Sequence, residues 1–503
     1  PEADALAAQA RVTLRAAAER AAALGSHEQA LGFLDQALEA TTDAAERADL
    51  HERAIPSARA GTDADVVERH ARGAAEAYRA AGDREGIARA TAQLGLVFAD
   101  YRADPRRTLE LLLPAWEEFA DLEDTPAGVS LMLAIVRGYG GVDEAEAQYR
   151  WAERLLPAAE KLGLMTSIVS ALAGKASALG RLGRAREAAV LIEGAHALAL
   201  RHDLASVEWR IRVLLTFGHQ WRDPGRGLAL AREGQEIAQR LGSRAYSFLM
   251  VGNAVLCAIR TGDWEWAAAQ LEEWLSPAPP ASDVIEFLVD RAILDALHGR
   301  DPSGDLDAVA SELEALTDPQ YRSYHQLGHT WFALGEGRLA DAMAAAQRAA
   351  AATSYFPAIA LPVAARAALW AGDATQARAF LDALEVSGYQ GSALDVDKAA
   401  IRAGLLALDG RPAEALAAYR DVLRGWRGLK LPWDEALTSI DMTSLLDPSE
   451  AEVRAAGEAG REILVRLEAA PFLARLDTAL ARTESDRAAP APRLDAEAAV
   501  PSV

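Results

Sequence analysis

Residues 25–43 read GSHEQALGFLDQALEATTD, a glycine followed by apolar residues at helical spacing. Gly25 ends one apolar run, and Ala30, Leu34 and Ala37 then follow at intervals of four and three residues. This spacing places the three side chains on one face of a helix. Glycine adopts the positive φ that a tight turn after a helix needs. The segment therefore predicts a helical hairpin.

The same pattern follows five other glycines. The six turn glycines are Gly25, Gly183, Gly262, Gly337, Gly372 and Gly410, and the residue five positions later is always alanine: Ala30, Ala188, Ala267, Ala342, Ala377 and Ala415. The residues nine and twelve positions after each glycine continue the apolar stripe: Leu34, Ile192, Leu271, Ala346, Leu381 and Tyr419, then Ala37, Ala195, Trp274, Ala349, Leu384 and Val422. A small side chain early in the second helix lets the two helices approach closely. We therefore interpret the pattern as a repeat of helical hairpins.

Weaker turn signals fill the gaps between these hairpins. They lie at Gly61, Asp104-Pro105, Gly140-Gly141, Asp223-Pro224-Gly225, Gly299 and Asp447-Pro448, so that successive turns are about 35–43 residues apart. No segment alternates apolar and polar residues as a strand would. The sequence predicts an all-α, right-handed superhelical solenoid of about twelve hairpins of the tetratricopeptide (TPR) type, with a concave inner face. It would cover residues 1–482, with capping helices at 453–482 broken at Pro471 and a disordered tail at 483–503.

Charge and cysteine content exclude several classes of protein. The 503 residues carry a net charge of −22, which argues against a nucleic-acid surface or an anionic membrane surface. The single cysteine, Cys257, lies in an apolar run and is expected to be a buried structural thiol in a reducing cytoplasm. No apolar run is long enough to span a membrane. The chain begins at Pro1 within a helical pattern, so we expect it to be part of a larger protein.

Motifs that suggest chemistry have simpler structural explanations. Gly140 to Glu144 (GGVDE) is similar to a diguanylate cyclase signature, but it falls at the repeat spacing of a turn. Gly174-Lys175 lacks the rest of a phosphate-binding loop. His325 and His329 have the spacing of a two-histidine metal site but no nameable third ligand, so packing or partner contact is favoured. We predict no catalytic residue, no cofactor and no metal.

Aromatic and basic residues at inner-face positions are the candidate binding residues. Arrays of this kind bind peptides or sugars through such side chains on a concave face. The candidate groove contacts are Arg210, Phe217, Trp221, Tyr324, His325 and Trp331. The alternative is that the tryptophans fill gaps between repeats.

Two segments carry a family resemblance. Residues 26–54, preceded by AAAERAAALG, and residues 461–480 (REILVRLEAAPFLARLDTAL) resemble the C-terminal TPR region of large bacterial signalling proteins. These are multidomain proteins of the adenylate/guanylate-cyclase type with a central ATPase, and the maltose-activator-like ATPase regulators have a related arrangement. The catalytic modules of these families are absent from this sequence. The resemblance implies a regulatory arm that binds a ligand or partner.

Three functions remain open from the sequence. The leading one is a non-catalytic scaffold or sensor arm of a larger cytoplasmic regulator, which binds a protein partner, an attached module or a small-molecule effector. The second is a free-standing adaptor that binds a peptide or partner protein in its concave groove. The third is an α/α-barrel enzyme, which is disfavoured because twelve hairpins are twice the number that such a barrel uses.

Overall fold

The computed structural model describes residues 2–60, 63–102 and 104–482, and within these ranges it contains 25 α-helices, two short 3₁₀ helices and no strand. The odd-numbered helices are α1 (Glu2–Ala23), α3 (Ala44–Ala60), α5 (Arg84–Asp100), α7 (Pro126–Gly141), α9 (Met165–Arg181), α11 (Ala205–Arg222), α13 (Arg244–Thr261), α15 (Ile285–His298), α17 (Pro319–Gly335), α19 (Pro357–Trp370), α21 (Ser392–Leu408), α23 (Pro432–Leu445) and α25 (Ala470–Leu480). The even-numbered helices are α2 (His27–Glu39), α4 (Ala64–Ala81), α6 (Pro105–Phe119), α8 (Ala145–Lys161), α10 (Ala185–Arg201), α12 (Pro224–Leu241), α14 (Trp264–Leu275), α16 (Ser303–Glu312), α18 (Leu339–Ala352), α20 (Ala374–Val386), α22 (Pro412–Leu429) and α24 (Ala451–Arg466). The 3₁₀ helices are Ala120–Leu122 and Ala281–Asp283.

The helices form twelve consecutive hairpins followed by α25, which confirms the predicted all-α, TPR-like solenoid. Each predicted turn lies at or next to the end of the first helix of a pair, although Gly61 lies outside the described residues. One prediction needs correction in detail, because Gly140 and Gly141 are the last residues of α7. The turn itself is made by the next residues, where Asp143 takes a positive φ of 64°. The break before α25 also precedes Pro471, which lies in the first turn of that helix.

The six turn glycines and their alanines behave as predicted. The glycines have φ between 73° and 77°, the left-handed conformation that other residues adopt only at a cost. All six alanines are buried, with exposed fractions of 9% or less. The stripe residues nine and twelve positions after each glycine are also buried, except that Trp274 is half-buried. A close approach of the two helices after each turn therefore fixes the shape of each hairpin.

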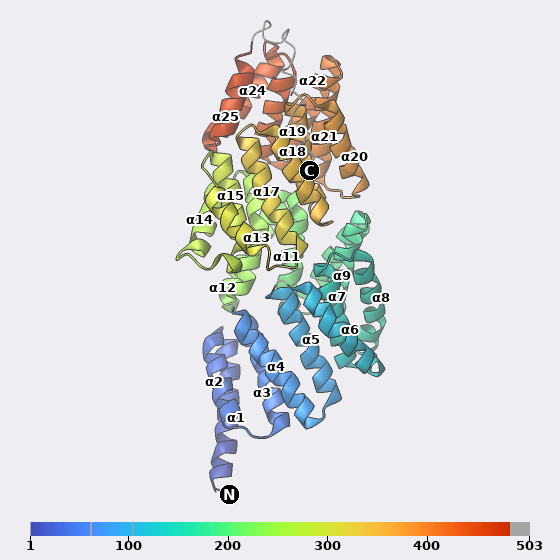
Figure 1. Ribbon diagram of the computed structural model, residues 1–503, viewed down its shortest axis with the longest axis vertical. Helices are drawn as coiled ribbons and strands as arrows, with labels where there is room; N and C mark the ends of the chain where they lie inside the picture. Colours follow the sequence, from blue (N-terminus) through green and yellow to red (C-terminus); the bar gives the residue numbers. More distant parts are fainter. Residues whose placement is uncertain (1, 61–62, 103, 483–503) are drawn as a thin grey trace, which may run out of the picture.

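The hairpins follow one another along an elongated molecule (Figure 1), and the contacts between superhelical turns place odd-numbered helices on the inner side. Contacts between residues far apart in sequence join inner helices: α3 packs on α13, α11 on α19 and α21, α13 on α23, and α15 on α25. The N-terminus and α25 lie at opposite ends of the molecule (Figure 1). The hairpins therefore do not close into a ring, and the α/α-barrel alternative is wrong.

Consecutive turns of the superhelix contact each other through their loops. The His27 imidazole Nε2 lies 3.0 Å from the Leu241 carbonyl oxygen, 214 residues away. The Thr317 hydroxyl donates to the Asp104 carboxylate at 2.9 Å, over 213 residues. These separations correspond to between five and six hairpins. One superhelical turn therefore takes slightly more than two fifths of the chain, and the next turn lies directly against it.

Two glycine turns meet where α9–α10 approaches the loop after α20. Gly183 and Gly388 have φ of 75° and 73°. A Cβ atom on Gly388 would lie 2.5 Å from the Cα atom of Gly183. Any larger residue would therefore push the two superhelical turns apart.

Asp143 forms the most extensive contact between consecutive turns. Its carboxylate accepts hydrogen bonds from the Thr353 hydroxyl at 3.0 Å and from the Ser354 backbone N–H at 2.6 Å and hydroxyl at 2.5 Å. The Arg181 guanidinium, whose side chain is 1% exposed, lies 2.9 Å from the same carboxylate. We call Asp143, Arg181, Thr353 and Ser354 the inter-turn clip. It joins the α7–α8 turn to the loop between α18 and α19.

Aromatic side chains fill the interior of the C-terminal half. Trp433 on α23 packs with ring centroids 5.1 Å from Trp264, 6.1 Å from Trp331 and 4.9 Å from Phe472. These rings belong to one apolar core that extends from α11 to α25. The inner face is therefore filled by side chains in this half, as the gap-filling alternative for the tryptophans predicts.

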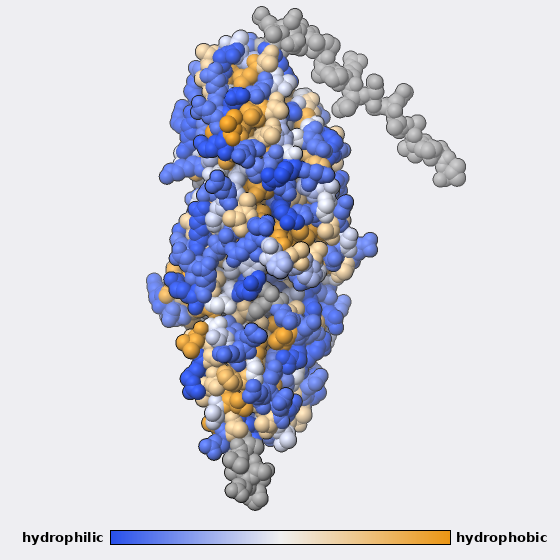
Figure 2. Space-filling model, turned by 90° about the vertical axis from the view of Figure 1, so that its left-hand side faces the viewer, coloured by the Kyte–Doolittle hydropathy of each residue, from blue (hydrophilic) through white to orange (hydrophobic). Residues whose placement is uncertain are grey.

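The outer surface is mainly polar. Figure 2 shows hydrophilic residues over most of one long face, with apolar residues in separate patches. Within the described ranges, none of the helices combines the length and the apolar character that a membrane-spanning segment requires.

Replacing a hairpin alanine by leucine should destabilise the array. Ala377 is fully buried and Ala379, on the same helix, is exposed. We expect Ala377→Leu to lower the free energy of unfolding by about 1–3 kcal/mol through overpacking, measured by urea denaturation followed by circular dichroism. Ala379→Leu is the control and should change it by less than about 0.5 kcal/mol. Equal midpoints for the two variants would contradict the close approach inferred for this position.

Removing the Asp143 carboxylate should open the inter-turn clip. Asp143→Ala leaves the buried Arg181 guanidinium without its carboxylate, which we expect to cost about 3 kcal/mol. The control is Asp203→Ala, because Asp203 also has a positive φ, of 52°, but is exposed in a loop. Hydrogen exchange should become faster in residues 140–145 and 352–356 of the first variant only. Similar exchange in both variants would show that backbone strain, not the clip, is what the substitution changes.

Candidate functional site

Most of the predicted groove contacts are covered by other residues of the chain. Trp221, Tyr324, His325 and Trp331 are 6–8% exposed, and Arg210 and Phe217 are half-buried. They do not form one row: Arg210, Phe217 and Trp221 lie on α11, and the other three lie on α17. In this conformation only Arg210 and Phe217 offer appreciable surface to a ligand, and the binding role of the six stays a prediction.

The contacts of the aromatic candidates explain their burial. Trp221 packs edge-on against Tyr389, with ring centroids 5.1 Å apart, and Phe217 packs against Trp221 at 5.3 Å. The Tyr324 hydroxyl donates a hydrogen bond to Asp290, a fully buried carboxylate. Burial raises the pKa of Asp290 well above its usual value, although this hydrogen bond opposes the shift. The loop between α20 and α21 and the neighbouring helix α15 thus cover side chains that the repeat pattern marks as inner-face residues.

The two histidines on α17 contact each other. The His325 Nε2 atom lies 3.0 Å from the Leu306 carbonyl oxygen, and the two rings are 4.6 Å apart, edge to face. Burial and the neighbouring His325 lower the pKa of His329 to about 4. Across residues 2–60, 63–102 and 104–482, no cluster of three or more His, Cys, Asp or Glu residues is placed to hold a metal ion.

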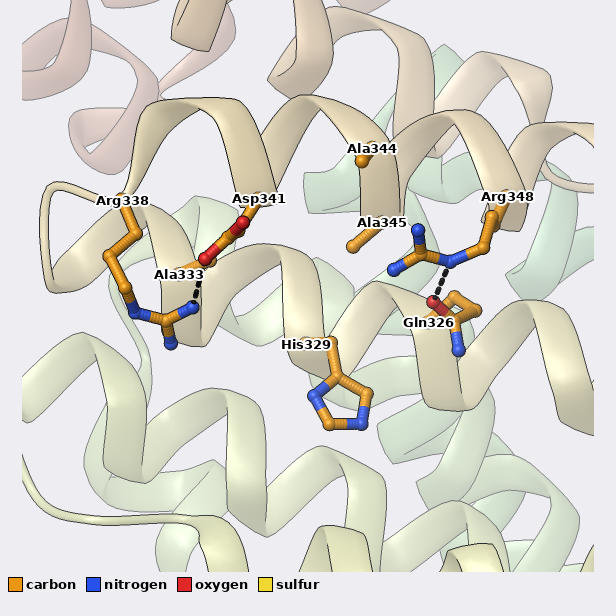
Figure 3. A pocket seen from close by; sticks show the side chains of 8 residues that line it. All are labelled: Gln326, His329, Ala333, Arg338, Asp341, Ala344, Ala345 and Arg348. Atoms are coloured by element: carbon orange, nitrogen blue, oxygen red, sulfur yellow. Dashed lines mark hydrogen bonds and ion pairs between the residues drawn. The ribbon is translucent and has the colours of Figure 1, made fainter. Parts of the chain in front are cut away.

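His329 also lines a shallow pocket between α17 and α18 of about 270 Å³ (Figure 3). The Arg348 guanidinium donates to the Gln326 side-chain oxygen at 2.8 Å, and Arg338 lies 2.7 Å from the Asp341 carboxylate. Figure 3 shows these pairs on either side of the imidazole, with alanines between them. The polar groups of the pocket thus bind one another, and we do not assign a ligand to it.

A group of arginines in the N-terminal half forms a different kind of site. Asp100, the last residue of α5, accepts a hydrogen bond from Arg137 on α7 at 2.6 Å and from Arg210 on α11 at 3.3 Å. Arg59, near the end of α3, is a third positive charge that acts on the same carboxylate. We call Arg59, Arg137 and Arg210 around Asp100 the interior arginine cluster. It brings together four inner helices, including residues 110 positions apart.

Charge is incompletely balanced within the interior arginine cluster. Three guanidinium groups surround one carboxylate, whose pKa they hold far below its usual range despite its burial. Burial and the like charge of Arg137 lower the pKa of Arg210 to about 10. The Nε and one Nη atom of Arg59 are buried and have no hydrogen-bond partner. The Arg137 and Arg210 side chains are still 37% and 30% exposed, so solutes can reach them.

Two carboxyl groups near the start of α17 also have raised pKa values, and one of them, Asp318, acts on Arg137. Burial and the nearby Asp318 together raise the pKa of Glu286, on α15, to about 7. Burial also raises the pKa of Asp318, the N-cap of α17, to about 6, although the Gln320 backbone N–H and Arg137 oppose the shift. Both groups are therefore partly protonated near neutral pH.

The C-terminal half has a comparable charge group with a different balance. Arg260 on α13 donates to Asp397 on α21 at 3.0 Å and to Asp434 on α23 at 2.9 Å. Arg366 on α19 donates to the Asp441 carboxylate at 3.1 Å, and Arg475 on α25 is a further positive charge that acts on Asp441. Three carboxylates thus face three guanidinium groups here, whereas Asp100 alone faces three arginines. The interior arginine cluster is therefore the better candidate for a binding site.

Sequence reasoning found only Arg210 of this cluster. Arg59, Asp100 and Arg137 all lie in or near the last turn of the first helix of a hairpin, but nothing in the repeat pattern distinguishes them from surface charges. The other sequence-level suggestion, Cys257, is fully buried, and burial raises the pKa of its thiol to about 12. This agrees with a structural thiol.

The chain is similar to known proteins in fold but not in sequence family. No protein-family model matches the sequence, and no curated protein matches it. Among solved structures, the chain is similar to the APC/C hetero-tetramer Cut9–Hcn1, with 12% identity, coverage of 93% of this chain and 96% of that one, and a TM-score of 0.38. It is also similar to Naa15/Naa10 bound to HypK-THB, with 12% identity, 93% coverage of each chain and a TM-score of 0.26. A circular tandem repeat protein has 18% identity, coverage of 95% and 98%, and a TM-score of 0.16. Similarities this distant do not indicate a shared function.

The buried carboxyl group of Glu286 should make stability depend on pH. Its pKa in the fold is about 7 against a usual 4.5, so the folded state keeps the proton that the unfolded chain loses as the pH rises. Stability is then lost between about pH 4.5 and 7, by up to about 3 kcal/mol. We expect Glu286→Gln to remove this part of the pH dependence, measured by urea denaturation from acid to alkaline pH. The exposed Glu265, on α14, is the control, and an equal change in Glu265→Gln would contradict the assignment.

Proposed function

We propose that this chain is a non-catalytic scaffold or sensor arm, which binds a protein partner or a small ligand and regulates a module attached to it. The observation that supports this most directly is the contact between consecutive superhelical turns. Arrays of hairpins change pitch through small rotations between neighbouring repeats. Loop contacts such as the inter-turn clip hold one pitch, and a ligand that prefers another pitch would open them.

Regulation would then follow from a shift in population. A ligand shifts an equilibrium only through its different affinities for the two states. The bonds of the clip that cross between turns are those that Asp143 accepts from Thr353 and Ser354. A hydrogen bond to a charged group contributes about 1.5–3 kcal/mol, so losing one such bond corresponds to roughly a tenfold to hundredfold change in the ratio of closed to open forms. A ligand would need a comparable preference to open the array. The resemblance of residues 26–54 and 461–480 to the repeat regions of cyclase- and ATPase-linked regulators supports a signalling context, and the lone buried thiol is compatible with the cytoplasm.

The alternative is a free-standing adaptor with a fixed shape. Such a protein would bind a peptide or partner without a change in pitch. The two functions therefore differ in whether the loops of consecutive turns separate when something binds.

Fluorescence energy transfer across the inter-turn clip tests whether consecutive superhelical turns separate, as a regulatory arm requires. Cysteines introduced at the exposed Glu146 on α8 and Ala351 on α18 can be labelled in the full chain, since the native thiol is buried and unreactive. We expect Asp143→Ala to lower the transfer efficiency and Asp203→Ala to leave it unchanged. Partners or effectors that regulate through the arm should also lower it. A transfer efficiency unaffected by Asp143→Ala and by bound partners would indicate a rigid adaptor instead.

A further inference from the structure

We propose that the interior arginine cluster binds a multiply charged oxyanion, such as a phosphate or a small polycarboxylate. This deepens the proposed function by naming a ligand class for the arm, and it rests on that function only for its regulatory consequence. The binding site itself follows from the geometry of Arg59, Arg137, Arg210 and Asp100.

The first argument is the number of free donors. A guanidinium group carries five N–H donors, and planar pairs of them match the oxygens of phosphates and carboxylates. Asp100 accepts one bond from Arg137 and one from Arg210. The Nε atom and one Nη atom of Arg59 are buried and have no hydrogen-bond partner. Buried donors are almost always bonded in folded proteins, so an oxyanion beside Arg59 would satisfy donors that the chain itself leaves unpaired.

The second argument is electrostatic. Three positive charges face one carboxylate, and the charges that most affect the pKa of Arg210 are Arg137, Asp100 and Arg59. Asp318 also acts on Arg137, but the raised pKa values of Asp318 and Glu286 keep part of both groups protonated near neutral pH, so they balance the arginines only in part. An anion placed among the arginines would relieve their mutual repulsion in a partly desolvated site.

The carboxyl ends of the inner helices favour a ligand with more than one negative charge. Arg59, Asp100 and Arg137 lie in or near the last turns of α3, α5 and α7. Helix carboxyl ends carry partial negative charge, which offsets part of the positive charge of the arginines. A singly charged anion therefore gains little, whereas a multiply charged oxyanion can engage several guanidinium groups at once. The site should accordingly discriminate against chloride and acetate.

The location gives the ligand a regulatory role. The arginines come from α3, α7 and α11, and Asp100 lies on α5, so an anion among them would bridge inner helices of at least three hairpins. Arg137 also interacts with Asp318, which lies at the start of α17 in the next superhelical turn. Bridging these helices would stabilise one pitch of the array.

Anion titration of the full chain tests the site. Thermal unfolding and calorimetry would be measured with inorganic phosphate, citrate, acetate and chloride at matched ionic strength. We expect saturable binding and a raised Tm with phosphate or citrate, and neither with acetate or chloride. If phosphate alone binds, the ligand class is the phosphates; if citrate alone binds, it is the polycarboxylates. No saturable binding of either anion would overturn the proposal.

Matched variants assign the binding to this cluster. Arg59→Gln should weaken binding at least tenfold, and Arg79→Gln, at an exposed position on α4, should leave it unchanged. Asp100→Asn should tighten binding about fivefold, because it removes the competing carboxylate. A gain of affinity cannot arise from misfolding, so this variant keeps the test valid if Arg59→Gln is unstable. Equal affinity in the wild type, Arg59→Gln and Asp100→Asn would overturn the assignment.

The energy-transfer measurement separates this inference from the proposed function. Because the anion would stabilise the pitch in which the clip is closed, it should restore the transfer efficiency in the Asp143→Ala variant. Oxyanion binding to that variant without such a recovery would support the site and contradict its regulatory role. A protein partner that changes the transfer efficiency in a chain that binds no oxyanion would support the arm and contradict the site.

Discussion

The whole structure depends on the close approach of two helices after each turn. Where the second helix passes nearest the first, only a small side chain fits, and alanine occupies that place in six hairpins. Turns recur every 35–43 residues along the chain, and the close approach is found in half of the twelve hairpins. Small, similar rotations between neighbouring hairpins add up to a superhelix. The buried alanines therefore contribute to the pitch of that superhelix and to the contact between its turns.

The individual hairpins can be predicted from the sequence, but the contacts between hairpins that are distant in the chain cannot. Gly25 and Ala30 reveal a hairpin because turn and stripe are both contained within about twenty residues. The repeat pattern predicts Trp331 at an inner-face position, but it cannot show its neighbours there, Trp433 and Phe472, which are more than a hundred residues further along the chain. Its burial depends on the pitch, which no local pattern encodes. The same limit explains why Arg210 was identified without its partner Asp100.

Different kinds of side chain occupy the space between the inner helices in the two halves of the molecule. In the C-terminal half, aromatic rings and a paired charge group around Arg260 fill the space between facing helices. In the N-terminal half, charged side chains remain partly exposed, and arginines are in excess around Asp100. Buried charges without full pairing are costly. The C-terminal half is therefore closely packed, whereas arginine side chains of the N-terminal half remain open to solvent.

Contact between consecutive turns also changes how such an array can fold and how it can be shortened. A simple repeat array is stabilised by nearest neighbours, so it folds from any point and tolerates the loss of terminal repeats. Here the first hairpin contacts Leu241, more than two hundred residues away. Such long-range contacts slow folding, because distant segments must meet before they gain stability. Deleting α1 and α2 would thus expose the α12–α13 loop in the middle of the chain. The deletion would destabilise a segment that lies a full superhelical turn away.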